Sequence, residues 1–290
     1  PPDREGDSMA RMLKHLLPIM LVLGSGPVLA QEEPDACADV VELDGSAAAQ
    51  FRAMVLEPGR TFGIRDIPPA SPARLEYLKM VEEQQKKDWS NLCRYREENA
   101  AVLKAGPRPR VIFLGDSITE NWKAADPAFF SHATLDRGIS GQTTPQILLR
   151  MFPDVIRLRP RAVHILAGTN DVSGATGPAT DDMIVDNLTA MIQLAKTNGI
   201  RVVLAAITPT NGYALRPNGL NPALRIAGLN ARLRQLAAKE QVTFLDYSPV
   251  LAATDGGLKP ELSNDRLHPN RAGYALMRPL AERAITQALR

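Results

Sequence analysis

The chain has few aromatic residues and no excess of either charge. Aromatic side chains make up 5% of its 290 residues, which leaves little material for base-stacking platforms or aromatic-lined sugar grooves. The 34 basic and 32 acidic residues give a net charge of +2, and no long run of one sign occurs. We therefore expect no nucleic-acid partner, because such a partner calls for a strongly basic surface.

Long hydrophobic runs are also scarce. The apolar run Leu16–Leu23 is too short to span a bilayer comfortably and contains Pro18. It follows Arg11 and Lys14 and precedes a stretch of small residues that ends at Ala30, which is the pattern of a signal peptide. We expect residues 1–30 to be upstream residues and a signal peptide cleaved after Ala30. The mature protein would then be secreted or periplasmic, without a membrane span; an uncleaved anchor is the alternative.

Cysteine is rare as well. The chain has two cysteines, Cys37 and Cys93. An even pair in an exported protein predicts a disulfide, which would stabilise the fold by roughly 4 kcal/mol through loop closure. The alternative is a pair of unbonded buried thiols. With no cysteine–histidine cluster in the sequence, we expect no metal site.

Residues 31–106 are predicted to form an N-terminal extension that packs on a main domain at residues 107–290. Residues 31–70 are irregular, with a short helix expected near Ala47–Met54. Ser71 and Pro72 are typical of a helix start, and apolar residues then recur at three-to-four spacing as far as Leu103. This pattern predicts one long helix that ends at Gly106.

Beyond residue 110, short apolar runs alternate with amphipathic helical patterns. The expected strands are Val111–Leu114, Thr134–Arg137, Ala162–Ala167, Val202–Ile207 and Val242–Leu245, and the expected helices are Thr144–Leu158, Thr180–Asn198, Pro222–Glu240 and Arg271–Leu289. This alternation predicts an α/β fold, a three-layer, doubly wound (flavodoxin-like) sandwich with a mainly parallel sheet of about five strands. Pro279 predicts a kink or a break in the last helix.

Ligands bind at the carboxyl ends of the strands in such sheets, so the loops that follow the strands should carry the chemistry. Gly115, Asp116 and Ser117 follow the first strand. A serine at the start of a helix exposes its hydroxyl and can aim its own backbone N–H at a developing oxyanion. Ser117 is therefore a candidate nucleophile, although a Gly-Asp-Ser sequence can also be a plain helix cap.

A candidate base precedes the last helix. Asp265 stands three residues before His268, so its carboxylate can accept the Nδ1 proton of the imidazole and leave Nε2 free to act as a base. A local Asp–His turn bond is the alternative. His164 lies within an apolar strand, and we expect it to be a core residue.

Two further loops offer hydrogen-bond donors. Asn170 follows the third strand, where its amide can reach an oxyanion, and Gly141 follows the second, where its backbone N–H can do the same. Ser117, Gly141 and Asn170 would then form an oxyanion hole. Together with His268 and Asp265 they complete the set of groups that acyl transfer needs, with no cofactor and no metal.

The same motifs resemble the GDSL/SGNH hydrolases. The family's four blocks are matched in order by Gly115-Asp116-Ser117, by Gly141, by Gly168-Thr169-Asn170-Asp171 and by Asp265 with His268. The resemblance covers roughly residues 110–289 and leaves the extension out. It implies a serine nucleophile at Ser117, the triad partners His268 and Asp265, and oxyanion donors at Ser117, Gly141 and Asn170.

The expected activity is the hydrolysis of a carboxylic ester through an acyl-enzyme. A short acyl group on an extracellular carbohydrate is the favoured substrate, and a lysophospholipid, an aryl ester or O-acyl transfer to a glycan acceptor are the alternatives; a catalytically silent glycan-binding protein belongs to another class. Many family members have Gly after the last-block Asp, whereas this chain has Arg266, which we expect to face solvent. The loop Tyr213–Ala223 is expected to shape the substrate pocket. The sequence does not indicate an oligomeric state.

Overall fold

The computed structural model describes residues 35–38, 40, 45–59, 72–131, 133–213 and 221–290. The chain divides into two compact units, Pro1–Ala38 and Asp39–Arg290. In the first unit, a turn follows Asp35, whose side chain accepts a hydrogen bond from the N–H of Cys37. The predicted signal peptide, residues 1–30, lies outside the described residues, as do residues 214–220 of the loop expected to shape the pocket.

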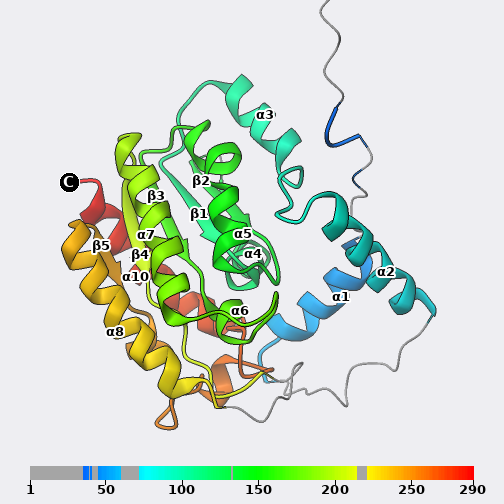
Figure 1. Ribbon diagram of the computed structural model, residues 1–290. Helices are drawn as coiled ribbons and strands as arrows, with labels where there is room; N and C mark the ends of the chain where they lie inside the picture. The colour runs from blue at the N-terminus through cyan, green and yellow to red at the C-terminus, as the bar shows by residue number, and fades with distance from the viewer. Residues whose placement is uncertain (1–34, 39, 41–44, 60–71, 132, 214–220) are drawn as a thin grey trace, which may run out of the picture. The chain divides into compact units, whose positions relative to one another are not determined.

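A five-stranded sheet forms the centre of the second unit (Figure 1). Its strands are β1 (Val111–Gly115), β2 (Thr134–Gly138), β3 (Ala162–Leu166), β4 (Arg201–Ala205) and β5 (Thr243–Leu245). All neighbours pair in parallel, in the order β2-β1-β3-β4-β5. The predicted doubly wound α/β fold is confirmed. The strand order reverses between β1 and β3, which is where such sheets bind ligands.

Helices cover both faces of this sheet. They are α4 (Ser117–Ala125), α5 (Thr144–Leu149), α6 (Thr169–Val172), α7 (Asp181–Thr197), α8 (Ala223–Glu240), α9 (Ser248–Leu251) and α10 (Arg271–Ala288). A π-helical turn (Phe152–Ile156) and a 3-10 turn (Pro260–Leu262) also lie in the region that follows β1. The predicted helix over residues 144–158 is therefore divided, because Pro153 cannot donate a backbone hydrogen bond within an α-helix.

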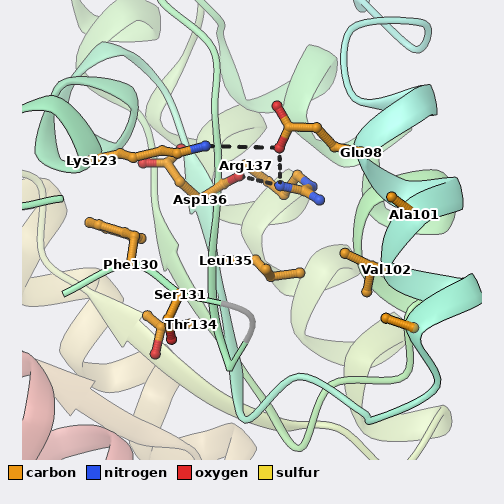
Figure 2. A pocket seen from close by; sticks show the side chains of 11 residues that line it. Glu98, Ala101, Val102, Lys123, Phe130, Ser131, Thr134, Leu135, Asp136 and Arg137 are labelled. Carbon is orange, nitrogen blue, oxygen red and sulfur yellow. Dashed lines mark hydrogen bonds and ion pairs between the residues drawn. The ribbon is translucent and has the colours of Figure 1, made fainter. Parts of the chain in front are cut away.

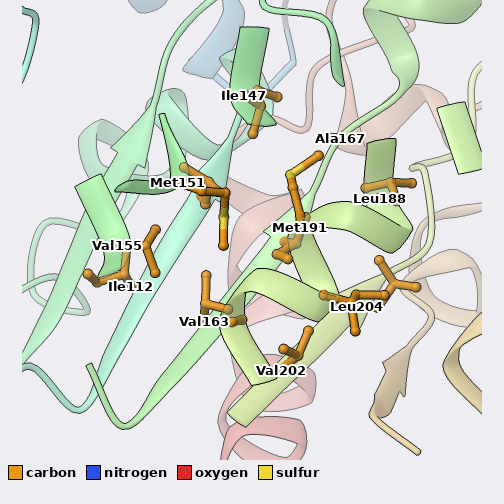
Figure 3. Close-up of a cluster of buried hydrophobic side chains, with 14 of the residues drawn as sticks. Ile112, Ile147, Met151, Val155, Val163, Ala167, Leu188, Met191, Val202 and Leu204 are labelled. Atoms are coloured by element: carbon orange, nitrogen blue, oxygen red, sulfur yellow. The ribbon is translucent and has the colours of Figure 1, made fainter. Parts of the chain in front are cut away.

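Two apolar cores form because successive strand residues point to opposite faces. Ile112 and Leu114 of β1 belong to the first core, which α5, α7 and α8 cover (Figure 3). Val111 and Phe113 belong to the second core, where α4 and α10 pack on the other face. The central strands β1 and β3 are buried along their whole length, as their apolar runs predicted.

The helix α10 runs unbroken through Pro279. Of the two outcomes predicted at Pro279, a kink or a break, the break is therefore wrong. Proline removes one backbone donor, but Met277, Ala281 and Ile285 on either side are fully buried in the second core. Their packing holds both halves of the helix against the sheet.

The extension contains α1 (Gly45–Leu56), α2 (Pro72–Lys87) and α3 (Arg96–Ala105). The single long helix predicted for residues 71–106 is wrong, because residues 88–95 separate two helices. Asp88 accepts hydrogen bonds from the N–H groups of Leu92 and Cys93 at 2.8 and 2.9 Å. Asn91 adopts the left-handed conformation, with φ 53°. This side-chain cap competes with the helical hydrogen bonds and ends α2.

Candidate active site

Ser117 lies at the point where β1 passes into α4. It is the first residue of that helix, and the side chain of Asp116 caps the helix by accepting the N–H of Ile118 at 2.9 Å. Gly115 is required for this tight passage, because a Cβ there would come within 2.2 Å of Thr119 Oγ1 and 2.5 Å of the Leu166 carbonyl. The Ser117 hydroxyl is thus placed beyond the carboxyl end of β1, as predicted.

Ser117, His268 and Asp265 form a hydrogen-bonded chain. Nε2 of His268 lies 2.8 Å from Oγ of Ser117, and Nδ1 of His268 lies 2.6 Å from Oδ2 of Asp265. The other carboxylate oxygen, Oδ1, accepts the backbone N–H groups of Leu267 and His268 at 3.0 and 2.8 Å. One carboxylate therefore shapes the loop with one oxygen and orients the imidazole with the other.

The electrostatics favour a protonated His268 beside an ionised Asp265. Burial acts to lower the pKa of His268, but the charge and hydrogen bond of Asp265 outweigh it, and the pKa of His268 is raised above 6.5. Burial acts to raise the pKa of Asp265, but the imidazolium and the two backbone N–H groups outweigh it, and this pKa is lowered below 3.8. Asp265 therefore stabilises the protonated imidazole of His268, which is the form that a general base takes once it has accepted a proton.

Asn170 lies at the carboxyl end of β3, in the short helix α6. Its Nδ2 donates to the carbonyl of Gln142 at 3.0 Å and lies 3.4 Å from Oδ2 of Asp116. The amide therefore contacts the residue before Ser117 and the residue after Gly141. The structure brings these three loops together.

Gly141 forms the turn between β2 and α5. Its φ of 80° lies in the left-handed region, which glycine adopts without strain. A Cβ at this position would meet no atom within 4 Å, so the turn faces open space. Within the described part of the chain, no group accepts its backbone N–H, which leaves that donor available to a ligand.

Asp116 is a buried acid directly before Ser117. Burial raises its pKa to about 7, opposed by the hydrogen bond from Ile118 and the charge of His268. Its carboxyl therefore changes charge near neutral pH, at 3.4 Å from the Asn170 amide. From the sequence, Asp116 is predicted only as the middle residue of the Gly-Asp-Ser motif.

Arg150 supports the site, and the sequence analysis missed it. Its fully buried guanidinium donates to the carbonyls of Gly115 and Arg137, at the ends of β1 and β2, and to Oε1 of Gln142 at 2.7 Å. It also forms an ion pair with Asp154 at 2.8 Å. One side chain thus fixes the loops that carry Ser117 and Gly141. In the sequence Arg150 falls within the predicted helical pattern of residues 144–158, which carries no signal of such burial; in the structure it follows the last residue of α5.

The extension holds the same loops from outside. Gln142 Nε2 donates to the carbonyl of Ser90 at 2.8 Å, next to the break between α2 and α3. Asn264, directly before Asp265, donates to the carbonyl of Val55 at the end of α1 at 3.0 Å. The extension therefore contacts both the loop that carries Gly141 and the loop that carries Asp265 and His268.

His164, Cys37 and Cys93 take no part in the hydrogen bonds between Ser117, His268 and Asp265. His164 is fully buried, shares a hydrogen bond with the Tyr247 hydroxyl at 2.9 Å, and has its pKa lowered to about 3 by burial. Cys37 and Cys93 are both disulfide-bonded, so neither is a free thiol. The described residues include no group of His, Cys, Asp and Glu that could hold a metal ion. No helix in the described ranges has the length and apolarity of a membrane span.

A separate cavity of about 360 Å³ lies at the outer edge of β2 (Figure 2). Val102 of α3 and Leu135 of β2 form part of its apolar wall, and Glu98, Lys123 and Arg137 carry charges at one end. None of the residues of the hydrogen-bonded chain lines it.

Comparison with known proteins gives the family. The model of the GDSL-like lipase/acylhydrolase family matches residues 113–276, which is more than half of the chain. The chain belongs to this family. The family resemblance stated from the motifs is thereby confirmed, and the protein is a hydrolase of the acylhydrolase type.

Solved structures of other family members agree. A GDSL-like lipase from Bacteroides thetaiotaomicron shares 38% identity over 69% of this chain and 99% of its own, with a TM-score of 0.65. A Bacteroides fragilis protein provisionally named an acylhydrolase shares 39% identity over 70% of this chain and 99% of its own, with a TM-score of 0.66. A comparison with curated proteins finds no match.

Proposed function

We propose that this acylhydrolase cleaves carboxylic esters through an acyl-enzyme on Ser117. The observation that carries the proposal is the hydrogen-bonded chain from Ser117 Oγ through His268 to Asp265, with distances of 2.8 and 2.6 Å. Nucleophile, base and orienting acid occur in the order and spacing that nucleophilic catalysis by serine needs.

In the first half-reaction, Ser117 Oγ attacks the ester carbonyl as His268 Nε2 takes its proton. The tetrahedral intermediate then collapses, and the imidazolium returns the proton to the departing alkoxide, so the alcohol leaves. Asp265 keeps the proton of the neutral imidazole on Nδ1 and stabilises the imidazolium. In the second half, His268 removes a proton from water, the resulting hydroxide attacks the acyl-enzyme, and the carboxylic acid is released as Ser117 regains its proton.

The negative oxygen of each tetrahedral intermediate needs donors. We assign them to the backbone N–H groups of Ser117 and Gly141 and to Nδ2 of Asn170. Two features support this. Ser117 is the first residue of α4, so its N–H has no helical acceptor, and the Gly141 N–H is also unused within the described residues. Preorganised donors of this kind supply a large share of the catalysis in acyl transfer.

We further propose that the enzyme acts outside the cytoplasm on a short acyl ester, such as an acetyl group, on a carbohydrate. The signal-peptide pattern of residues 1–30 and the disulfide-bonded state of Cys37 and Cys93 support export. An exported enzyme meets extracellular glycans, and acyl esters on such glycans fit this location.

A chain-length series tests both parts of the proposal. The mature protein, its Ser117→Ala variant and a control with Ser140→Ala are assayed on p-nitrophenyl esters from acetate to laurate. We expect turnover that is highest with acetate and lost in Ser117→Ala but kept in Ser140→Ala. Equal rates in wild type and Ser117→Ala would refute the serine mechanism, and a preference for laurate would refute the short-acyl assignment.

A further inference from the structure

Arg266, between Asp265 and His268, has an unusual backbone conformation. Its φ is 70°, in the left-handed region that costs a residue with a Cβ conformational energy and that glycine adopts freely. The conformation is held by its neighbours. Thr210 Oγ1 donates to the Arg266 carbonyl at 2.8 Å, and the following N–H, of Leu267, donates to Asp265. Strain of this kind next to reacting groups points to a use for the side chain.

The guanidinium of Arg266 is held by a neutral group. Nε and Nη2 both donate to Oδ1 of Asn211, at 3.1 and 2.9 Å. Asn211 is itself held by Asp255, whose Oδ2 accepts from Nδ2 at 2.6 Å. Within the described residues no carboxylate forms an ion pair with Arg266. Two of its five N–H groups are used, and the fork of Nη1 and Nη2 keeps donors for a second, planar acceptor.

Contacts of residues 210–213 connect this guanidinium to two loops of the candidate active site. A Cβ at Gly212 would lie 3.5 Å from Nη2 of Arg266. The next residue, Tyr213, reaches the other side of the site, where its hydroxyl donates to the carbonyl of Thr169 at 3.1 Å, next to Asn170. The guanidinium therefore lies along a segment that joins the loop of His268 to the loop of Asn170.

We propose that Arg266, held by Asn211, is a subsite for a carboxylate on the alcohol part of the ester substrate. The subsite rests on the proposed function, since it presupposes esters at Ser117. A guanidinium whose fork is exposed recognises a carboxylate with two parallel hydrogen bonds. The chemistry points to acyl esters of acidic sugars, whose ring carboxylate lies within a few bonds of the esterified hydroxyl.

Matched aryl acetates test the subsite. The substrates are phenyl acetate, 3-acetoxybenzoate, its methyl ester, and the 3-acetoxyphenyl trimethylammonium ion. The Arg266→Gly variant suits the left-handed backbone, and Arg266→Lys keeps the charge without the fork. Arg110→Ala is the control, because Arg110 also bonds a neutral partner, Thr286, but precedes β1 at the opposite end of the sheet.

For each substrate, kcat/KM of the variant is divided by that of wild type, so that leaving-group reactivity cancels. We expect Arg266→Gly to lower the ratio for 3-acetoxybenzoate at least about fivefold, mainly through KM, and to leave phenyl acetate and the methyl ester unchanged. The ratio for the cationic ester should rise. For 3-acetoxybenzoate, the ratio of Arg266→Lys should lie between that of Arg266→Gly and the wild-type value of one. The wild-type preference for the anion should weaken with added salt.

Two outcomes overturn the subsite. One is an equal loss on all four esters in Arg266→Gly, which would make Arg266 a structural residue of the loop. The other is no change on 3-acetoxybenzoate while phenyl acetate is turned over. In both cases the proposed function stands as long as Ser117→Ala abolishes turnover of phenyl acetate. A wild type that hydrolyses none of the esters contradicts the proposed function itself.

Discussion

The change Asp265→Asn is a direct test of the Asp–His–Ser chain. Asparagine can keep an oxygen at the Oδ1 position, where Asp265 accepts the N–H groups of Leu267 and His268. The loop is therefore expected to hold its shape. At the other position, an NH2 group replaces the oxygen that lies 2.6 Å from Nδ1 of His268. Nδ1 must then accept a hydrogen bond, which moves the imidazole proton to Nε2.

A proton on Nε2 removes the base from Ser117, whose Oγ lies 2.8 Å away. We expect kcat/KM to fall by about 10⁴, the size of loss that the wrong tautomer causes in a serine triad. This corresponds to about 5 kcal/mol of transition-state stabilisation, at 1.36 kcal/mol for each factor of ten. Loss of the carboxylate charge should also lower the pKa of His268, which Asp265 raises in the wild type.

The assay is the pH profile of kcat/KM with p-nitrophenyl acetate. The neutral imidazole is the active form, so wild-type activity should rise with pH through a midpoint above 6.5. In Asp265→Asn the residual activity should be far lower, with its midpoint shifted to lower pH. Asp182→Asn, at an exposed position of α7, is the matched control and should behave as wild type. A loss below tenfold in Asp265→Asn, with an unshifted midpoint, would refute the reasoning.

Two further results are expected. Asn170→Ala removes one oxyanion donor and should lower kcat about a hundredfold with little change in KM, measured by steady-state kinetics; a change in KM alone would instead make Asn170 a substrate-binding residue. Burial raises the pKa of Asp136 to about 7. Between the unfolded pKa of 3.8 and pH 7, the folded chain therefore keeps a proton on Asp136 that the unfolded chain has lost. The free energy of unfolding falls as pH rises through this range, because the folded state must then ionise a buried carboxyl. Relative to wild type, Asp136→Asn should therefore become more stable from pH 5 to pH 8 in denaturant titrations, and a constant difference across this range would contradict the assignment.

The candidate site was predictable because its motifs stand directly after strands. Ser117 and Asn170 each follow a parallel strand, and the carboxyl ends of parallel strands lie at one edge of the sheet. The strand prediction alone therefore predicts that the two residues lie close together. Asp265 and His268 are close in sequence, so their hydrogen bond needs a local turn and little else. The supporting residues were not predictable in this way. Arg150 is buried by carbonyls from two distant strand ends, and its place in the predicted helical pattern of residues 144–158 gives no sign of them.

The extension shows the same limit. The three-to-four spacing of apolar residues predicts a helix at Leu78 and again at Leu103, but it cannot reveal a break between them. The break depends on the Asp88 carboxylate, which captures two backbone N–H groups, and on the left-handed Asn91. Next to it, the Ser90 carbonyl accepts a hydrogen bond from Gln142, a distant residue. The spacing of apolar residues predicts which face of a helix is buried, but it does not predict which side chain accepts the backbone N–H groups in place of the helical carbonyls.

Local periodicity and the rules of chain connection are enough to predict the strand and helix alternation, the parallel sheet and the four loops that carry the motifs. How those loops are held depends on contacts that form only in the folded protein. Arg150 fixes two of them through backbone carbonyls, Asn264 joins the Asp265 loop to α1, and Arg266 lies on Asn211 with its fork of donors exposed. These contacts join residues far apart in the chain, and only the folded backbone brings their atoms within hydrogen-bond distance.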